Sequence, residues 1–281
     1  MPTETISVAS VNAAAERLEA ARAAAALAGA EALRWFGASG LAVRSKDDRS
    51  PVTAADLAAE RVLRESLLGR FPDDAFLGEE SGAVGGTSGY EWIVDPIDGT
   101  RSFIRGVPLW ATLVGCRHEG RGVVGVIAIP ALDEGVYAAA GAGAWHVTRG
   151  GAAAPARVSA RPTLAEGLCC SSDFTSFGRR ADARAGEAAR RRVEAACGTL
   201  RTWGDGYGYL LVATGRADVM IDPLMNAWDA AAVETVIAEA GGRFTDWRGR
   251  PRIDSGEGLA TNGVVHDALL HLLTNPASPA G

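Results

Sequence analysis

Residues 92–100 read Trp-Ile-Val-Asp-Pro-Ile-Asp-Gly-Thr. The apolar start of this segment is typical of a strand that is covered on both faces. Pro96 fixes a turn behind that strand, so the carboxylates of Asp95 and Asp98 can face one point. The carbonyl of Ile97 can turn toward the same point. Since Mg²⁺ and Mn²⁺ prefer hard oxygen ligands, the segment predicts a metal-bearing turn.

A phosphate site is predicted directly behind this turn. Gly99 has no side chain where a phosphate would press on the backbone, and the N–H groups of Gly99 and Thr100 can donate to it. Two further acidic segments have similar settings. Glu79 lies in Gly-Glu-Glu-Ser after an apolar strand, and Asp229 lies in Trp-Asp-Ala-Ala at the start of an apolar helix. Carboxylates at strand ends and helix starts tend to meet at one edge of a sheet.

The rest of the chain predicts a mixed α/β protein with sheets layered against helices. We expect helices over residues 10–36, 54–68, 181–196, 206–214, 227–240 and 266–273. We expect strands over residues 75–78, 90–94, 110–117, 122–129, 136–140, 144–148, 167–172 and 217–221. Residues 82–89 are interpreted as a Gly/Ser connector. The Gly/Ala/Pro-rich residues 141–162 predict a seam between an N-terminal half (1–150) and a C-terminal half (151–281).

Composition excludes several classes of protein. The 281 residues carry a formal net charge of -6, which disfavours binding to nucleic acid. No uncharged apolar run reaches the roughly 20 residues that a membrane-spanning helix needs. The start, residues 1–4, lacks the cationic region of a secretory signal, so we expect a cytoplasmic protein. The four cysteines lack zinc spacing and are expected to be reduced thiols.

Together these segments resemble the inositol monophosphatase family of Mg²⁺-dependent phosphatases. The resemblance covers residues 12–275. It is carried by residues 92–100, by Trp-Asp-Ala-Ala at 228–231 with Ala-Gly-Gly at 240–242, and by Gly-Glu-Glu-Ser at 78–81. Residues 50–56, Ser-Pro-Val-Thr-Ala-Ala-Asp, also match a family motif. The resemblance implies an α+β, layered α-β-α-β-α sandwich of the inositol monophosphatase and fructose-1,6-bisphosphatase type, assembled as a homodimer.

The resemblance also implies a ligand set for two or three Mg²⁺ ions, with Mn²⁺ as an alternative. Glu79, Asp95 and the Ile97 carbonyl would hold one metal. Asp95, Asp98 and Asp229 would hold the second, with Asp95 bridging the two. Such a pair of metals activates water and stabilises the leaving oxygen. We therefore expect in-line hydrolysis of a phosphate monoester, without a covalent phosphoenzyme.

The catalytic water has its own expected partners. By resemblance, Glu79 belongs to the catalytic set, and Thr100, hydrogen-bonded to Asp56, orients the water that attacks phosphorus. Thr100 therefore has two expected roles, one toward the phosphate and one toward the water.

Residues in the second half bear on the substrate. The family contacts the alcohol part of its substrate seven residues before the helix aspartate, which is Asp222 here. Residues 203–209, Trp-Gly-Asp-Gly-Tyr-Gly-Tyr, resemble the histidinol-phosphatase branch. L-histidinol phosphate carries an ammonium and an imidazole, with which Asp205 and Asp222 could pair. Arg101 is a further candidate for contact with phosphate or substrate.

Other readings stay open at this stage. Inositol-1-phosphate or another sugar phosphate is an alternative substrate, and so is 3'-phosphoadenosine 5'-phosphate. A catalytically silent binding protein of the same fold is an alternative from another class. Every metal position is filled, and Asp56 and Thr100 are both present, so the silent alternative has little support.

Overall fold

The computed structural model describes residues 8–38, 43–45 and 51–274. Its helices are α1 (Val8–Leu33), α2 (Ala54–Arg70), α3 (Thr100–Phe103), α4 (Ala183–Ala196), α5 (Asp205–Ala213), α6 (Ala227–Glu239) and α7 (His266–Thr274), with 3₁₀ turns at Pro130–Leu132, Leu164–Glu166 and Phe174–Arg179. The start of α2 is fixed by a capping box, because Thr53 and Asp56 satisfy each other's backbone N–H groups.

The strands form a pair and two larger sheets. The pair is β1 (Val43–Ser45) with β2 (Pro51–Thr53). The larger sheet has the order β10-β9-β8-β7-β6-β5-β3-β4 and the smaller has the order β12-β11-β13-β15-β14. Their bounds are β3 (Ala75–Gly78), β4 (Gly82–Val84), β5 (Tyr90–Asp98), β6 (Ala111–His118), β7 (Arg121–Ile129), β8 (Glu134–Ala139), β9 (Gly143–Val147), β10 (Ala154–Ala156), β11 (Leu168–Cys170), β12 (Thr199–Arg201), β13 (Val219–Asp222), β14 (Arg243–Thr245) and β15 (Gly258–Thr261).

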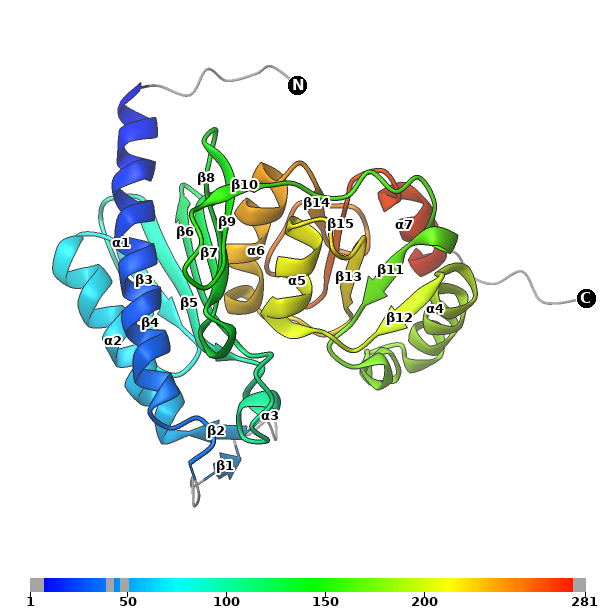
Figure 1. Cartoon of the computed structure of the whole chain (residues 1–281), viewed down its shortest axis with the longest axis horizontal. Helices are drawn as coiled ribbons and strands as arrows, with labels where there is room; N and C mark the ends of the chain where they lie inside the picture. The colour runs from blue at the N-terminus through cyan, green and yellow to red at the C-terminus, as the bar shows by residue number, and fades with distance from the viewer. Residues whose placement is uncertain (1–7, 39–42, 46–50, 275–281) are drawn as a thin grey trace, which may run out of the picture.

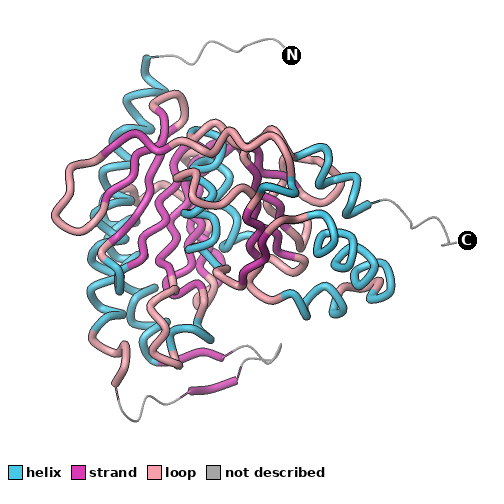
Figure 2. Tube along the Cα trace, turned by 45° about the vertical axis from the view of Figure 1, so that its right-hand side comes forward, coloured by secondary structure: helices cyan, strands magenta, loops and turns pink. Residues whose placement is uncertain are grey.

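These elements stack in five layers (Figure 1). Helices α1 and α2 cover the outer face of the larger sheet, α5 and α6 fill the space between the sheets, and α4 and α7 cover the outer face of the smaller sheet. Figure 2 shows the strands of the two sheets as separate groups with helices between them. The predicted α-β-α-β-α sandwich is therefore confirmed.

Most predicted elements are present, with two corrections. The prediction of a connector over residues 82–89 was wrong at its start, because Gly82–Val84 form β4, which pairs antiparallel with β3. The turn expected at Pro96 is instead a continuation of β5 to Asp98, with an irregularity in its pairing to β6 between Asp95 and Asp98. A proline has no N–H to donate to the ladder and is tolerated at such a bulge.

The change of sheet begins inside the predicted seam of residues 141–162 and ends beyond it. Strands of the larger sheet end at Ala156 and those of the smaller sheet begin at Leu168. Helix α6, from the C-terminal half of the sequence, packs on β5, β6 and β7 of the larger sheet. The division into halves 1–150 and 151–281 stays a prediction.

No helix in the described part of the chain is long and apolar enough to cross a membrane. The start of the chain, on which the expectation about a signal segment depends, lies outside the described residues. Of the four cysteines, Cys116, Cys169 and Cys170 are buried and all four are free thiols.

His266 is buried and gives a testable pH dependence of stability. Its ring nitrogens are hydrogen-bonded with the hydroxyls of Thr245 (3.0 Å) and Thr261 (2.9 Å). Burial, with a smaller contribution from Arg243, lowers the pKa of His266 to about 4. The unfolded chain then binds the proton more tightly, so stability is full above pH 6.5 and falls as the pH drops toward 4.

We expect this residue to remove about 2 kcal/mol of stability between pH 7.5 and pH 4.5. Denaturant midpoints at the two pH values would measure the loss. His266→Gln cannot take up this proton, so its loss over the same interval should be smaller by that amount. Equal losses in the two proteins would contradict a neutral buried His266.

Candidate active site

Three carboxylates meet where β5, an interior strand of the larger sheet, ends. Asp95 and Asp98 come from the end of β5, and Asp229 comes from the first turn of α6. One oxygen of each lies within 4.8 Å of one oxygen of each of the others. The prediction that these segments converge is confirmed, although their roles as ligands stay a prediction.

Backbone groups fix the orientation of each carboxylate. Asp95 accepts the N–H of Ile97 at 2.9 Å. Asp229 accepts the N–H of Asn226 at 2.8 Å, as the third helical residue of a capping box. Asp98 accepts the N–H of Gly206 at the start of α5. Three elements distant in sequence therefore hold the cluster in place.

The electrostatics of this cluster suit a cation. Burial raises the pKa of Asp95, and the charges of Glu79, Asp98 and Asp229 raise it further. Burial likewise raises the pKa of Asp98, and it raises the pKa of Asp229 to about 7. Clustered carboxylates repel one another in a low-dielectric setting, and a divalent cation relieves that repulsion. The donor set therefore fits a hard divalent metal ion.

Glu79 lies beside the cluster. It follows β3, the neighbour of β5 in the sheet. Its charge raises the pKa of both Asp95 and Asp229, and it shares a hydrogen bond with Asp95. The structure therefore brings Glu79 to the position that the sequence predicted.

Glu60 of α2 also belongs to the site, although no sequence pattern predicts it. Its buried carboxylate accepts the N–H groups of Glu80 (2.7 Å) and Ser81 (2.6 Å). A Cβ on Gly78 would lie 2.5 Å from its carboxyl carbon. Glu60 therefore fixes the backbone directly after Glu79 and packs against Gly78 directly before it. A single glutamate within a helix is usually solvated, so no local pattern marks Glu60 as a site residue.

The expected partnership of Thr100 and Asp56 is corrected by the hydrogen bonds. The hydroxyl of Thr100 donates to the carbonyl of Ile97 at 3.2 Å. Asp56 accepts the N–H of Thr53 at 2.8 Å and its hydroxyl at 2.6 Å. No hydrogen bond within the described ranges joins Thr100 to Asp56. The Asp56 carboxylate instead caps the N-terminus of α2. The family motif alone did not specify these hydrogen bonds.

A turn and a cavity adjoin the carboxylates. Gly99 has φ +89°, a left-handed conformation that favours glycine, and a Cβ there would lie 2.8 Å from an oxygen of Asp205. A cavity of about 430 Å³ begins at this turn. Its lining includes Gly99, Thr100, Arg101, Ser172, Asp205 and Asp222. The predicted phosphate and substrate residues therefore share one cavity.

The two acids of this cavity differ in their surroundings. Burial and the charge of Asp222 raise the pKa of Asp205 to about 6, against the opposing effects of Ser172 and Arg101. Asp222 is buried and accepts hydrogen bonds from Ser172 and Tyr209. Arg101 is exposed at the rim.

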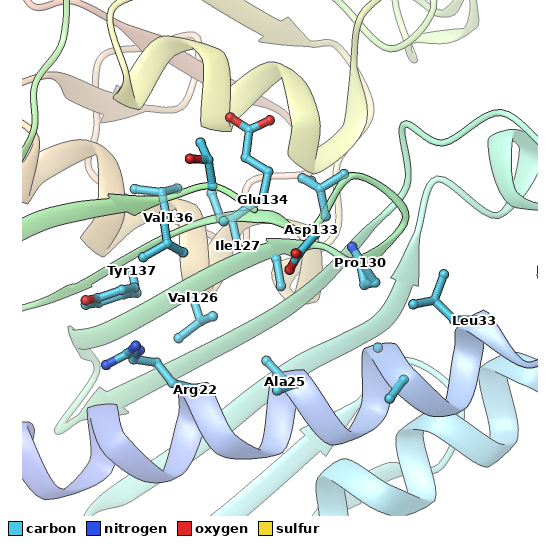
Figure 3. Close-up of a pocket in the computed structure, with 18 residues that line it drawn as sticks. Arg22, Ala25, Leu33, Val126, Ile127, Pro130, Asp133, Glu134, Val136 and Tyr137 are labelled. Atoms are coloured by element: carbon cyan, nitrogen blue, oxygen red, sulfur yellow. The ribbon is translucent and has the colours of Figure 1, made fainter. Parts of the chain in front are cut away.

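Another cavity, of about 370 Å³, lies between α1 and strands β7 to β9 (Figure 3). Its lining is mostly apolar, with Ala25, Leu33, Val126 and Pro130 among the residues, and Arg22 and Asp133 also line it. It contains none of the predicted site residues, so the chemistry belongs to the cavity beside the carboxylates.

A layered α/β fold with clustered carboxylates beside a Gly-Thr turn defines a class, the metal-dependent phosphate-ester hydrolases. Residues 13–276 match the model of the inositol monophosphatase family. The chain belongs to that family, whose members are generally metal-dependent and hydrolyse small phosphate monoesters.

Individual relatives agree with this assignment. The chain is 43% identical to a histidinol-phosphatase of Chlorobaculum parvum, over 83% of this chain and 87% of that one. It is 41% identical to a histidinol-phosphatase of Mycobacterium tuberculosis, over 84% and 89%. Among solved structures, the SuhB protein of Bartonella henselae superposes with a TM-score of 0.84 at 29% identity, covering 93% of this chain and all of that one. The predicted family resemblance is confirmed.

Proposed function

We propose that this enzyme hydrolyses L-histidinol phosphate to L-histidinol and phosphate with Mg²⁺ at the carboxylate cluster. The observation that carries the proposal is the cavity in which Asp205 and Asp222 lie beside the Gly99–Thr100 turn. Acids there suit an alcohol that carries an ammonium group. Support also comes from three relatives at 37–43% identity that are named histidinol-phosphatases.

Each residue has a proposed task. Glu79, Asp95, the Ile97 carbonyl, Asp98 and Asp229 hold two or three Mg²⁺ ions, or Mn²⁺ in their place. Bound there, the metals supply positive charge that acidifies water and neutralises phosphoryl oxygens. The N–H groups of Gly99 and Thr100 bind phosphate, and the Thr100 hydroxyl orients the attacking water.

The substrate alcohol has separate contacts. Asp205 and Asp222 bind its cationic group, and Arg101 contacts the substrate at the rim of the cavity. Because water attacks in line with the leaving oxygen, no side chain forms a bond to phosphorus. By family resemblance we further propose a cytoplasmic homodimer, which light scattering on the purified protein would test for its oligomeric state.

Thr100→Ala should lower kcat by about 100-fold and change KM little, because the hydroxyl acts on the attacking water. Steady-state kinetics with saturating Mg²⁺ would measure both constants. Thr214→Ala is a matched control, since the Thr214 hydroxyl also donates to a backbone carbonyl, that of Leu210, outside the cavity. If KM alone moved in Thr100→Ala, Thr100 would be a binding residue instead.

A phosphate-release panel tests the substrate. Histidinol phosphate, inositol-1-phosphate, fructose-1,6-bisphosphate and 3'-phosphoadenosine 5'-phosphate would be compared at one Mg²⁺ concentration. We expect kcat/KM for histidinol phosphate to exceed the others by more than about tenfold, or ~1.4 kcal/mol in transition-state binding. A larger value for any other ester would overturn the proposal.

A further inference from the structure

The ring and the hydroxyl of Tyr209 have separate contacts. Its ring is buried in α5 and lies 6.4 Å from the ring of Phe244, centroid to centroid. The phenol hydroxyl donates to Oδ2 of Asp222 at 2.8 Å. Phenylalanine would fill the same space without that hydrogen bond, so packing explains the ring but leaves the hydroxyl unexplained.

Ser172, which follows β11, contacts both acids of the cavity. Its N–H donates to Oδ1 of Asp222 at 3.2 Å, so each oxygen of Asp222 has a donor. Its hydroxyl oxygen accepts the N–H of Asp205 at 2.8 Å. Asp205 has φ +51°, a conformation that costs energy for a residue with a side chain and persists only where neighbours impose it.

The carboxylate of Asp222 accepts hydrogen bonds but forms no ion pair within the described ranges, although it is buried. Burying an unpaired carboxylate is costly, and a cationic ligand removes that cost. Burial raises the pKa of Asp222, and the hydrogen bonds from Ser172 and Tyr209 offset part of that rise. Each of its oxygens keeps a further lone pair for a ligand in the cavity.

We propose that Tyr209 and Ser172 are positioning residues that fix the carboxylates of Asp222 and Asp205 toward the cavity and so set a preference for an alcohol bearing an ammonium group. The inference rests on the proposed function, because it concerns the same substrate cavity. Tyr209 and Ser172 act through the two aspartates. Their loss therefore affects recognition of the cation more than the chemistry at phosphorus.

The test uses two substrates that differ only in the ammonium group, L-histidinol phosphate and its deamino analogue. Tyr209→Phe should lower the ratio of their kcat/KM values about tenfold, through KM for histidinol phosphate, with kcat changed less than about twofold. Tyr207→Phe is the matched control. It removes a hydroxyl from the same helix, and no hydrogen bond of that hydroxyl occurs in the part of the chain described.

Ser172→Ala is the second variant and removes the acceptor for the Asp205 N–H. It should lower the same ratio. An unchanged ratio in both variants would overturn the inference, as would equal losses for the two substrates, which indicate a packing role alone. The proposed function fails separately, if the wild-type enzyme does not favour histidinol phosphate in the four-ester panel.

Discussion

Asp95→Asn is expected to lower kcat/KM by about 1,000-fold or more, at least ~4 kcal/mol of transition-state stabilisation. Asp95 is buried at the centre of the carboxylate cluster, between Glu79, Asp98 and Asp229. By family resemblance, Asp95 is a ligand that two metal ions share. An amide of the same size has no charge to offer them. Kinetics with histidinol phosphate across a range of Mg²⁺ concentrations would measure the loss. Near-normal activity would contradict the two-metal assignment.

The same substitution should raise the melting temperature in the presence of a chelator. Burial and neighbouring acids raise the pKa of Asp95, so its charged form costs stability at neutral pH when no metal is bound. Asn removes that charge. A lower melting temperature would instead mean that the fold depends on the Asp95 carboxylate.

Asp74→Asn is the matched control for a buried carboxylate. Asp74 forms a bidentate ion pair with Arg17 and accepts the indole N–H of Trp92, away from the cluster. Breaking one partner of such a pair typically costs about 3–5 kcal/mol. We expect this variant to be less stable and to keep its activity while folded, the opposite pattern to Asp95→Asn.

The site was predictable where its chemistry is local in sequence. Asp95 and Asp98 lie in the last residues of β5 and Asp229 lies in the first turn of α6, and strand ends and helix starts tend to meet on one side of a sheet. Their convergence depends on where the strands and helices begin and end, and the apolar pattern of the sequence predicts those positions. Glu79 was predicted in the same way, from its place directly after an apolar strand, and that strand, β3, brings it beside Asp95.

The rest depended on contacts between distant segments. Glu60 acts on residues twenty positions away, because Gly78 lets α2 approach the strand end. Tyr209 and Ser172 look like ordinary packing and loop residues until Asp222 lies between them. The strands β12, β14 and β15 have only three or four residues, too few for a period-2 pattern to be recognised.

Gly125→Ala is expected to damage both stability and activity, although Gly125 touches no candidate ligand. It lies on β7 beneath α6, where an added Cβ would stand 2.2 Å from the carbonyl oxygen of Ala232. On the adjacent strand, a Cβ at Gly115 would stand 2.7 Å from the backbone of Ala231. Helix α6 therefore lies directly on two glycines, and a methyl group at either one moves it away.

The displacement would reach Asp229, in the first turn of α6. Small-to-large changes in a packed core cost about 1–3 kcal/mol. A shift of ~1 Å in a site residue can cost on the order of 100-fold in rate. We expect both losses in Gly125→Ala, with a higher Mg²⁺ concentration needed for half-maximal activity. Denaturant unfolding and Mg²⁺ titration of activity would measure them.

Gly69→Ala is the control for the same substitution in a helix without contacts. Nothing lies within 4 Å of a Cβ at Gly69, so alanine there should stabilise the protein by about 0.5–1 kcal/mol and leave the Mg²⁺ requirement unchanged. If Gly125→Ala lost stability but kept its Mg²⁺ requirement, the position of Asp229 would not depend on how closely α6 approaches the sheet. A joint loss would show that Gly125 sets the position of Asp229, a proposed metal ligand, through the packing of a whole helix.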